Sequence, residues 1–283
     1  MGAVVGQLRS SLALATMLDA DFSTFPLVSD HQYRAASLLG IDRLQRPLAA
    51  DTTLCAVSVS LPQQQIMELI DSWCSTTRTN STHAEERAAE LRQYFDGCGV
   101  ILDDRPWDVR GNMSVCTWQW VRQIFSRLGL RDRQRGIGVH IRWGDMSIFT
   151  DESDQLTRWR STPIDVAAQL LSKLRSCGVK DELSVYMELH NTTMLEGLGE
   201  RYRIVDTGDS VADLIDLASN RIMVLDIGSY TTLAHQMAEG GLSIIPDDGD
   251  SVIKWHWGGV NRVLRWNEVL SIPCDDLSNI IEQ

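Results

Sequence analysis

The chain has 283 residues, 43% of them hydrophobic, which is enough for two domains or one large one with a real core. Its 26 lysines and arginines against 38 aspartates and glutamates give a net charge of −12. Such an acidic chain has no cationic excess to neutralise a nucleic-acid backbone or an anionic membrane, so we expect no nucleic-acid partner. No apolar run approaches the roughly 18 residues that span a bilayer, so we expect no transmembrane segment in this chain.

Two interpretations of the N-terminus are open. The apolar run 12–18 behind Arg9 has some features of a signal peptide. Asp19 and Asp21 follow it directly, however, and no small-x-small cleavage site ends it. Apolar residues at helical spacing instead favour a helix over 3–20.

Six cysteines are present, with no C-x-x-C pair, which argues against zinc and thioredoxin-type sites. They are interpreted as disulfides or buried thiols. Three N-x-[ST] sequons begin at Asn80, Asn112 and Asn191. Sequons and an even cysteine count favour a glycoprotein of the secretory-pathway lumen, Golgi or ER. A signal or anchor is then expected upstream of this chain, and a cytoplasmic location stays open.

In the first part of the chain, the sequence pattern predicts several helices and one strand. The helices are expected over 63–74, 84–95 and 118–128, with a helical turn over 35–39, a strand over 54–61 and a polar loop over 75–83. A charged linker over 131–136 ends in glycine and marks the predicted domain boundary. The expected domains are an N-terminal α/β domain, 1–132, and a C-terminal domain, 133–283.

Strands and helices alternate after the linker. Strands are predicted over 136–142, 184–189, 222–226 and 242–245, and helices over 164–177, 211–219 and 232–239. This βαβ order predicts an α/β fold, a parallel sheet with helices on both faces. Such sheets bind ligands at the carboxyl ends of their strands.

Polar residues gather at two of these strand ends. His140 and Arg142 share one face of the first strand, and Asp145 follows the turn at Gly144. The Arg142 fork suits a diphosphate, and Asp145 can orient either neighbour, although a buried polar network closing the strand fits equally.

The second strand end, 222–226, runs through Gly228 into a helix start that carries the hydroxyls of Ser229, Thr231 and Thr232. Phosphate binds helix N-termini of this kind. An ordinary Ser/Thr cap of the helix is the alternative.

The segment Gly138-Val-His-Ile-Arg-Trp-Gly-Asp145 resembles the H-x-R-x-G-D motif of GDP-fucose-dependent fucosyltransferases, the α1,2-, α1,6- and protein O-fucosyltransferase superfamily. The resemblance covers 136–246, where Val185-Tyr-Met-Glu, Tyr202-Arg-Ile-Val-Asp206, the Asp213 helix and the Gly-Ser-x-Thr element follow in the family's order. More weakly, Gly6-Gln7-Leu8 is similar to the family's Gly-rich loop after its first strand, a strand that this chain lacks.

This resemblance implies two Rossmann-like domains facing a cleft, a GT-B-like glycosyltransferase. It implies that Arg142 grips the β-phosphate of GDP-fucose, with His140 beside the nucleotide. It also implies that Asp213 accepts from the guanine N1–H and N2–H₂, and that Ser229 donates to a phosphate. Asp145, Thr231 and Gly6 complete the expected donor site. The sequence departs from the family at Trp143, where many members have a second arginine, and at Asp226, where a small residue is usual.

The resemblance further implies an inverting reaction without metal or other cofactor, in which Arg142, Ser229 and a helix N-terminus stabilise the leaving diphosphate. Inversion needs a base, for which Asp151 and Glu152 are candidates, although surface carboxylates are common. The two D-x-D sequences, at Asp19 and Asp248, are interpreted as solvent-facing and not as metal ligands.

Trp255 and Trp257 flank His256 and share one face of an extended segment, where they could form a platform for an acceptor sugar or pack on the core. The acceptor, a glycan or a glycoprotein, is not identified by the sequence. The main alternative function is a catalytically silent, secreted relative that binds a glycan or nucleotide. A Rossmann-type protein for another phosphorylated ligand is disfavoured, since no G-x-G-x-x-G or P-loop motif occurs.

Overall fold

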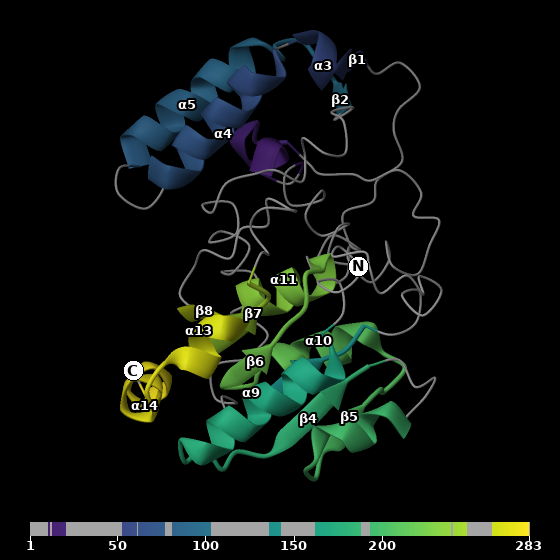
Figure 1. The fold of residues 1–283 in the computed structure, drawn as a ribbon. Coiled ribbons are helices and arrows are strands. Elements are labelled where there is room, and N and C mark those ends of the chain that lie inside the picture. Colours follow the sequence, from purple (N-terminus) through teal and green to yellow (C-terminus); the bar gives the residue numbers. More distant parts are fainter. Residues whose placement is uncertain are drawn as a thin grey trace. The chain divides into compact units, whose positions relative to one another are not determined.

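The computed structural model divides the chain into two compact units, Met1–Ile124 and Phe125–Gln283 (Figure 1). The predicted boundary at 132–133 falls in a stretch outside the described residues and stays a prediction. The structure describes residues 11, 13–20, 53–60, 62–76, 81–102, 136–142, 162–187, 193–238, 240–247 and 262–282.

The N-terminal unit pairs a helical hairpin with a small parallel sheet. Its elements are β1 (Leu54–Ala56), α3 (Val57–Ser60), α4 (Gln63–Thr76), α5 (Ser81–Gln93) and β2 (Val100–Leu102). Ile66, Ile70 and Leu91 are fully buried between α4, α5 and the helical residues 13–17. Of the helix expected over 3–20, residues 11 and 13–17 are helical, 18–20 are not, and 3–10 lie outside the described residues. A disulfide joins Cys55 in β1 to Cys98 beyond α5.

The strand predicted over 54–61 is wrong beyond Ala56, where the chain turns into α3. In the described part of the chain, β1 pairs with β2 over Leu54, Cys55 and Ala56. The Ser60 hydroxyl donates to the Ala56 carbonyl at 3.0 Å, a bond from residue i to i−4 that a helical turn allows. Hydrophobic alternation therefore gave the wrong period here.

The C-terminal unit contains a six-stranded sheet in which every neighbouring pair is parallel. Its strands are β3 (Ile137–His140), β4 (Leu183–Tyr186), β5 (Arg203–Val205), β6 (Ile222–Val224), β7 (Leu242–Ile245) and β8 (Arg262–Arg265). The order β5-β4-β3-β6-β7-β8 is the order of Rossmann folds. The predicted α/β class is confirmed.

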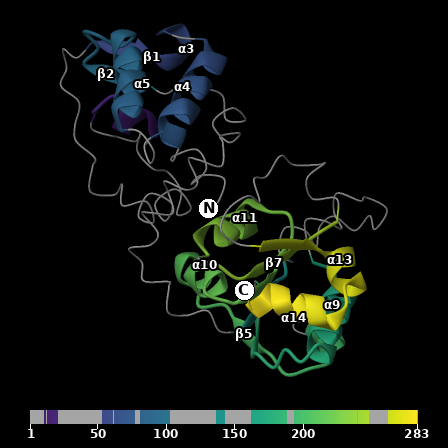
Figure 2. The same cartoon turned by 90° about the vertical axis from the view of Figure 1, so that its left-hand side faces the viewer.

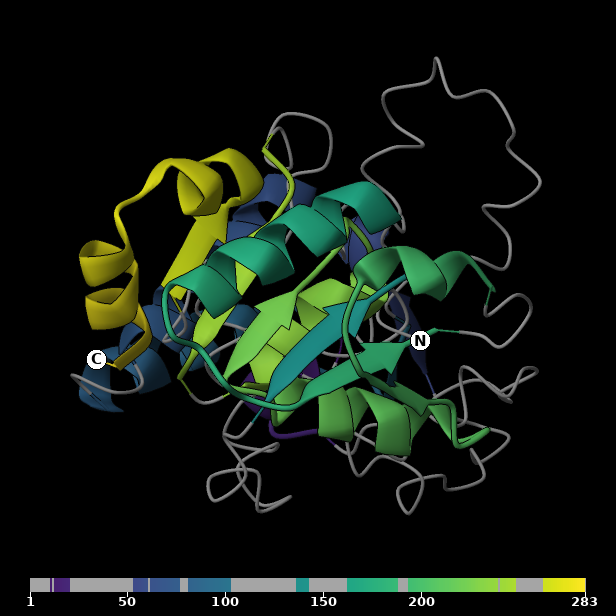
Figure 3. The ribbon, with the colours of Figure 1, turned by 60° about the horizontal axis from the view of Figure 1, so that its bottom comes forward.

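Helices cover both faces of this sheet (Figures 2 and 3). They are α9 (Ile164–Ser176), η3 (Thr193–Leu198), α10 (Ser210–Ala218), α11 (Ser229–Met237), α13 (Trp266–Ser271) and α14 (Cys274–Glu282). Compared with the predictions, α11 begins three residues earlier. The elements that were not predicted in this unit are η3, β5, β8, α13 and α14.

The two faces of the sheet differ in chemistry. One face is apolar: Ile137, Val139 and Val224 pack there in a core that includes residues of α9, α13 and α14. Because side chains alternate along a strand, His140 and Tyr186 point to the opposite face, toward α10 and α11. The sheet therefore has one apolar face and a second face on which His140 and Tyr186 make polar contacts.

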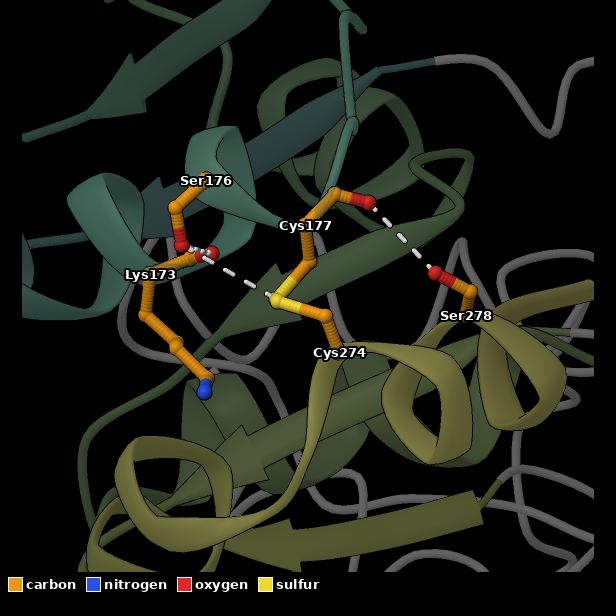
Figure 4. Close-up of a disulfide and its surroundings, with 5 residues drawn as sticks. All are labelled: Lys173, Ser176, Cys177, Cys274 and Ser278. Atoms are coloured by element: carbon orange, nitrogen blue, oxygen red, sulfur yellow. Dashed lines mark hydrogen bonds between the residues drawn. A yellow bond between two sulfur atoms is a disulfide. The ribbon is translucent and has the colours of Figure 1, made fainter.

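A second disulfide, Cys177–Cys274, ties the end of α9 to the first residue of α14 (Figure 4). Beside it, the Ser278 hydroxyl donates to the Cys177 carbonyl at 3.4 Å. The two disulfides suggest an oxidising environment. The asparagines of the three predicted sequons lie outside the described residues. Within the described part of the chain, no helix has the length and apolarity to cross a membrane.

Candidate functional site

The candidate site lies at the topological switch point of the sheet. From β3 the chain adds β4 and β5 on one side, then returns to place β6 on the other side of β3. Loops leave the carboxyl ends of β3 and β6 in opposite directions at such a point, and open α/β sheets bind ligands in the resulting crevice. His140 is the last residue of β3, and Asp226 lies two residues beyond β6.

His140 and Asp226 form a pair across this point. The distance from His140 Nδ1 to Asp226 Oδ2 is 2.9 Å, and the Asp226 side chain is 1% exposed against 14% for His140. A buried carboxylate is costly unless it is paired and hydrogen-bonded. The buried Asp226 carboxylate therefore has a hydrogen-bonding partner in His140.

Thr231 in the first turn of α11 gives Asp226 a second polar contact. Its hydroxyl lies 3.0 Å from Asp226 Oδ1, 3.0 Å from the Asp226 carbonyl and 2.9 Å from the Gly228 carbonyl, and can donate to one of them at a time. It also accepts from the Gly228 N–H at 3.1 Å. Thr231 was predicted as a donor-binding residue, but in the structure its hydroxyl is engaged in holding this turn.

Tyr230 covers one side of the His140 ring. The ring centroids are 5.2 Å apart with planes inclined by 33°, and the Tyr230 hydroxyl donates to the Ser210 carbonyl at 3.2 Å. Burial raises the pKa of Tyr230 above its ordinary value, and the nearby charge of Asp213 raises it further. Tyr230 is thus a neutral phenol that joins His140 to the start of α10.

These contacts leave the second ring nitrogen of His140 for a ligand. Nδ1 is bonded to Asp226 and Tyr230 contacts the ring. Within the described stretches, Nε2 makes no hydrogen bond. A histidine fixed through Nδ1 exchanges its proton at Nε2.

Asp213 lies in the first turn of α10, where the cap is Asp209, which accepts from the N–H groups of Val211 and Ala212. The Asp213 carboxylate accepts from the Thr207 hydroxyl at 2.7 Å and from the Thr207 N–H at 3.3 Å. Asp213 therefore braces the turn before α10, a structural role that the sequence did not predict.

The other predicted site residues are less fully placed. Arg142 follows β3 by two residues and is half-buried, and Ser229 is the first residue of α11. Six further residues lie outside the described part of the chain, so their roles stay predictions: Gly6, Asp145, Asp151, Glu152, Trp255 and Trp257.

Sequence reasoning missed the parts that Asp226 and Tyr230 play. One signal was present: Asp226 ends an apolar strand, where a carboxylate requires a partner. The partner could not be chosen from the sequence, because it depends on β3 lying next to β6. The register pairs Val139 with Val224, which sets the ends of these two strands side by side.

Metal ligands were not expected. In the residues that the structure describes, no three or more His, Cys, Asp or Glu side chains cluster so as to hold a metal ion. Asp248 and Asp250 of the second D-x-D sequence are outside those residues. The absence of a metal or other cofactor stays a prediction.

No family model matches this chain, and no curated protein matches it. Two solved structures are similar: the E. coli heptosyltransferase WaaC with ADP, at a TM-score of 0.45, and the same enzyme with ADP-2-deoxy-2-fluoro heptose, at 0.42. Each is 13% identical, over 100% of this chain and 96% of that chain. The fold class and the candidate site described above are drawn from the chain's own sheet and contacts.

Proposed function

We propose that this protein is an inverting, metal-independent glycosyltransferase that moves fucose from GDP-fucose to a hydroxyl of a glycan or protein. The supporting observation is the position of His140, at the switch point of a sheet with Rossmann order, where its Nε2 is bonded to none of the residues that the structure describes. The H-x-R segment thus ends where sheets of this order bind nucleotides. In this proposal the N-terminal domain supplies the acceptor side of a GT-B-like arrangement.

The diphosphate is held by cations and backbone dipoles. Arg142 offers a planar fork that can bind two phosphate oxygens at once. The first N–H groups of α11 have no acceptor within the helix, and the helix dipole favours an anion at that end. Together they stabilise the charge that develops on the leaving group, so the reaction needs no metal.

The reaction itself is a single displacement. The acceptor oxygen attacks the anomeric carbon, the bond from that carbon to the phosphate oxygen breaks, and GDP leaves with the electron pair. The hydroxyl proton passes to a base, for which Asp151 and Glu152 are the proposed candidates. The proposed location is the secretory-pathway lumen, Golgi or ER, in keeping with the disulfides.

Guanine selectivity rests on Asp213. A carboxylate has about four acceptor sites, so its bonds to Thr207 leave room for the guanine N1–H and N2–H₂. The same bonds favour a second candidate, in which Asp213 only braces its turn and the donor carries another base. That candidate keeps the transferase chemistry and changes the nucleotide.

Calorimetric titration of the full chain with GDP, ADP, UDP and UMP tests the proposal. We expect GDP to bind at least tenfold more tightly than the others. Preference for ADP or UDP would reject guanine and support the second candidate. No binding by any nucleotide would contradict a transferase and favour a silent glycan-binding protein, which a glycan-array measurement would then detect.

A further inference from the structure

We propose that Asp226 is a positioning residue that makes Nε2 of His140 the proton-carrying contact to the donor diphosphate, so that nucleotide binding takes up a proton. The inference rests on the proposed function for the identity of the ligand. The inference goes beyond the proposed function because it gives a role to the Asp226 carboxylate, which the expected donor site did not include.

The geometry fixes which nitrogen can exchange a proton with a ligand. Asp226 Oδ2 is 2.9 Å from Nδ1, and the carboxylate is held by a buried backbone at the end of β6. A carboxylate accepts only, so Nδ1 carries its proton whether or not the ring is charged. Protonation of the ring therefore occurs at Nε2.

The surroundings favour the charged ring once an anion is bound. The Asp226 charge is nearly fully buried, and Thr231 supplies only a hydroxyl dipole to it, so an imidazolium completes its neutralisation. The Tyr230 ring, 5.2 Å away, attracts a cation at its face. A phosphate oxygen at Nε2 adds a second negative partner.

Charged groups from each neighbouring element bear on this balance. From β6, Asp226 favours the imidazolium. Asp209, which caps α10, and Asp213 in its first turn lie near Tyr230, while Tyr186 on β4 is a neutral phenol because burial raises its pKa. Arg142, two residues beyond His140, opposes the charge.

The proton step is balanced without a further reactant. In the neutral ring, Nδ1–H donates to Asp226 and Nε2 holds a lone pair. A proton from the buffer binds Nε2, which then donates to a phosphate oxygen. Because the protonated form binds the anion more tightly, affinity falls as pH rises, and binding removes protons from the buffer.

Calorimetry in two buffers of different ionisation enthalpy measures this uptake directly, with GDP and with inorganic pyrophosphate as a base-free probe. We expect the wild-type protein to take up a fraction of a proton, up to about one, per ligand near pH 7.5. Asp226→Asn should abolish the uptake and weaken GDP binding about tenfold at that pH. Asp216→Asn is the matched control: it also removes one negative charge on this face of the sheet, from α10, and should leave the uptake intact.

Nitrogen NMR of the His140 ring, in wild-type protein without nucleotide, tests the positioning separately. We expect the neutral ring to carry its proton on Nδ1. A proton on Nε2 would overturn the inference, as would GDP binding without proton uptake or uptake that persists in Asp226→Asn. Failure of every nucleotide to bind would reject the proposed function, and the ring tautomer would still decide the role of Asp226. If Asp226→Asn does not fold, the two wild-type measurements suffice.

Discussion

The side-chain amide nitrogen of Asn220 lies 2.8 Å from the point where a Cβ atom on Gly138 would stand. That amide donates to the Tyr186 hydroxyl at 2.8 Å and lies within 3.0 Å of the carbonyls of Asp216 and Leu217. Asn220 thus joins the end of α10 to β4 and presses closely on β3. The strand that carries His140 has room only for glycine at position 138.

Gly138→Ala should destabilise the protein by about 1–3 kcal/mol, because the new methyl group meets a fixed amide and must displace it. Urea unfolding measures the effect. The double variant with Asn220→Ala removes the obstacle and should lose less than the sum of the two single changes. If the double variant loses as much stability as the two single variants together, the close contact between Gly138 and Asn220 does not account for the effect. Gln169→Ala, on the exposed side of α9, is the neutral control.

Replacing both Cys177 and Cys274 by alanine should lower stability by about 2–4 kcal/mol, since the disulfide closes a long loop, with a sequence separation of 97, and restricts the unfolded chain. α14 should also become more accessible to protease, because the disulfide holds its first residue to the end of α9. Ser278→Ala removes a single neighbouring hydrogen bond and should change stability far less. If Ser278→Ala lost as much stability as the double cysteine variant, the loss could not be assigned to the disulfide's restriction of the unfolded chain.

Arg142→Lys should reduce sugar transfer about a hundredfold, equivalent to roughly 3 kcal/mol of transition-state stabilisation, because an ammonium cannot reproduce a bidentate contact. The melting temperature should change little. Transfer within threefold of the wild-type rate would remove Arg142 from the donor site.

Asp213→Asn should weaken GDP binding by about 2–4 kcal/mol, since an amide would present a donor to the guanine donors. Thr207→Ala is the matched control, because it removes the 2.7 Å hydroxyl contact and leaves the carboxylate in place. We expect its GDP affinity to stay within threefold of wild type. Unchanged GDP affinity in Asp213→Asn would show that Asp213 only braces the turn before α10.

Sugar transfer should proceed at an unchanged rate in excess EDTA, because fixed cations and N–H dipoles stabilise the leaving diphosphate. Initial rates with and without the chelator test this. A requirement for Mn²⁺ that added metal restores would contradict the metal-independent mechanism and return attention to Asp248 and Asp250.

The sequence determined the class of the C-terminal domain and the position of its polar strand ends. Apolar runs such as 222–225 and glycine stops such as Gly178, whose φ is +86°, are local signals that can be recognised without knowing what the segment packs against. The strands β5, with three residues, and β8, with four, carry too few side chains for a period to show. The length of β1 was overestimated because its alternating pattern continues into residues that form α3.

Only the tertiary structure decided which of these residues meet. His140 and Asp226 are 86 positions apart, and the cysteines of the α9–α14 disulfide 97 apart. Each pairing depends on the order of strands in the sheet, and that order is a collective result of packing two faces at once. A sequence shows that a carboxylate at the end of an apolar strand needs a partner. The fold determines that the partner is the histidine on the next strand across the switch point.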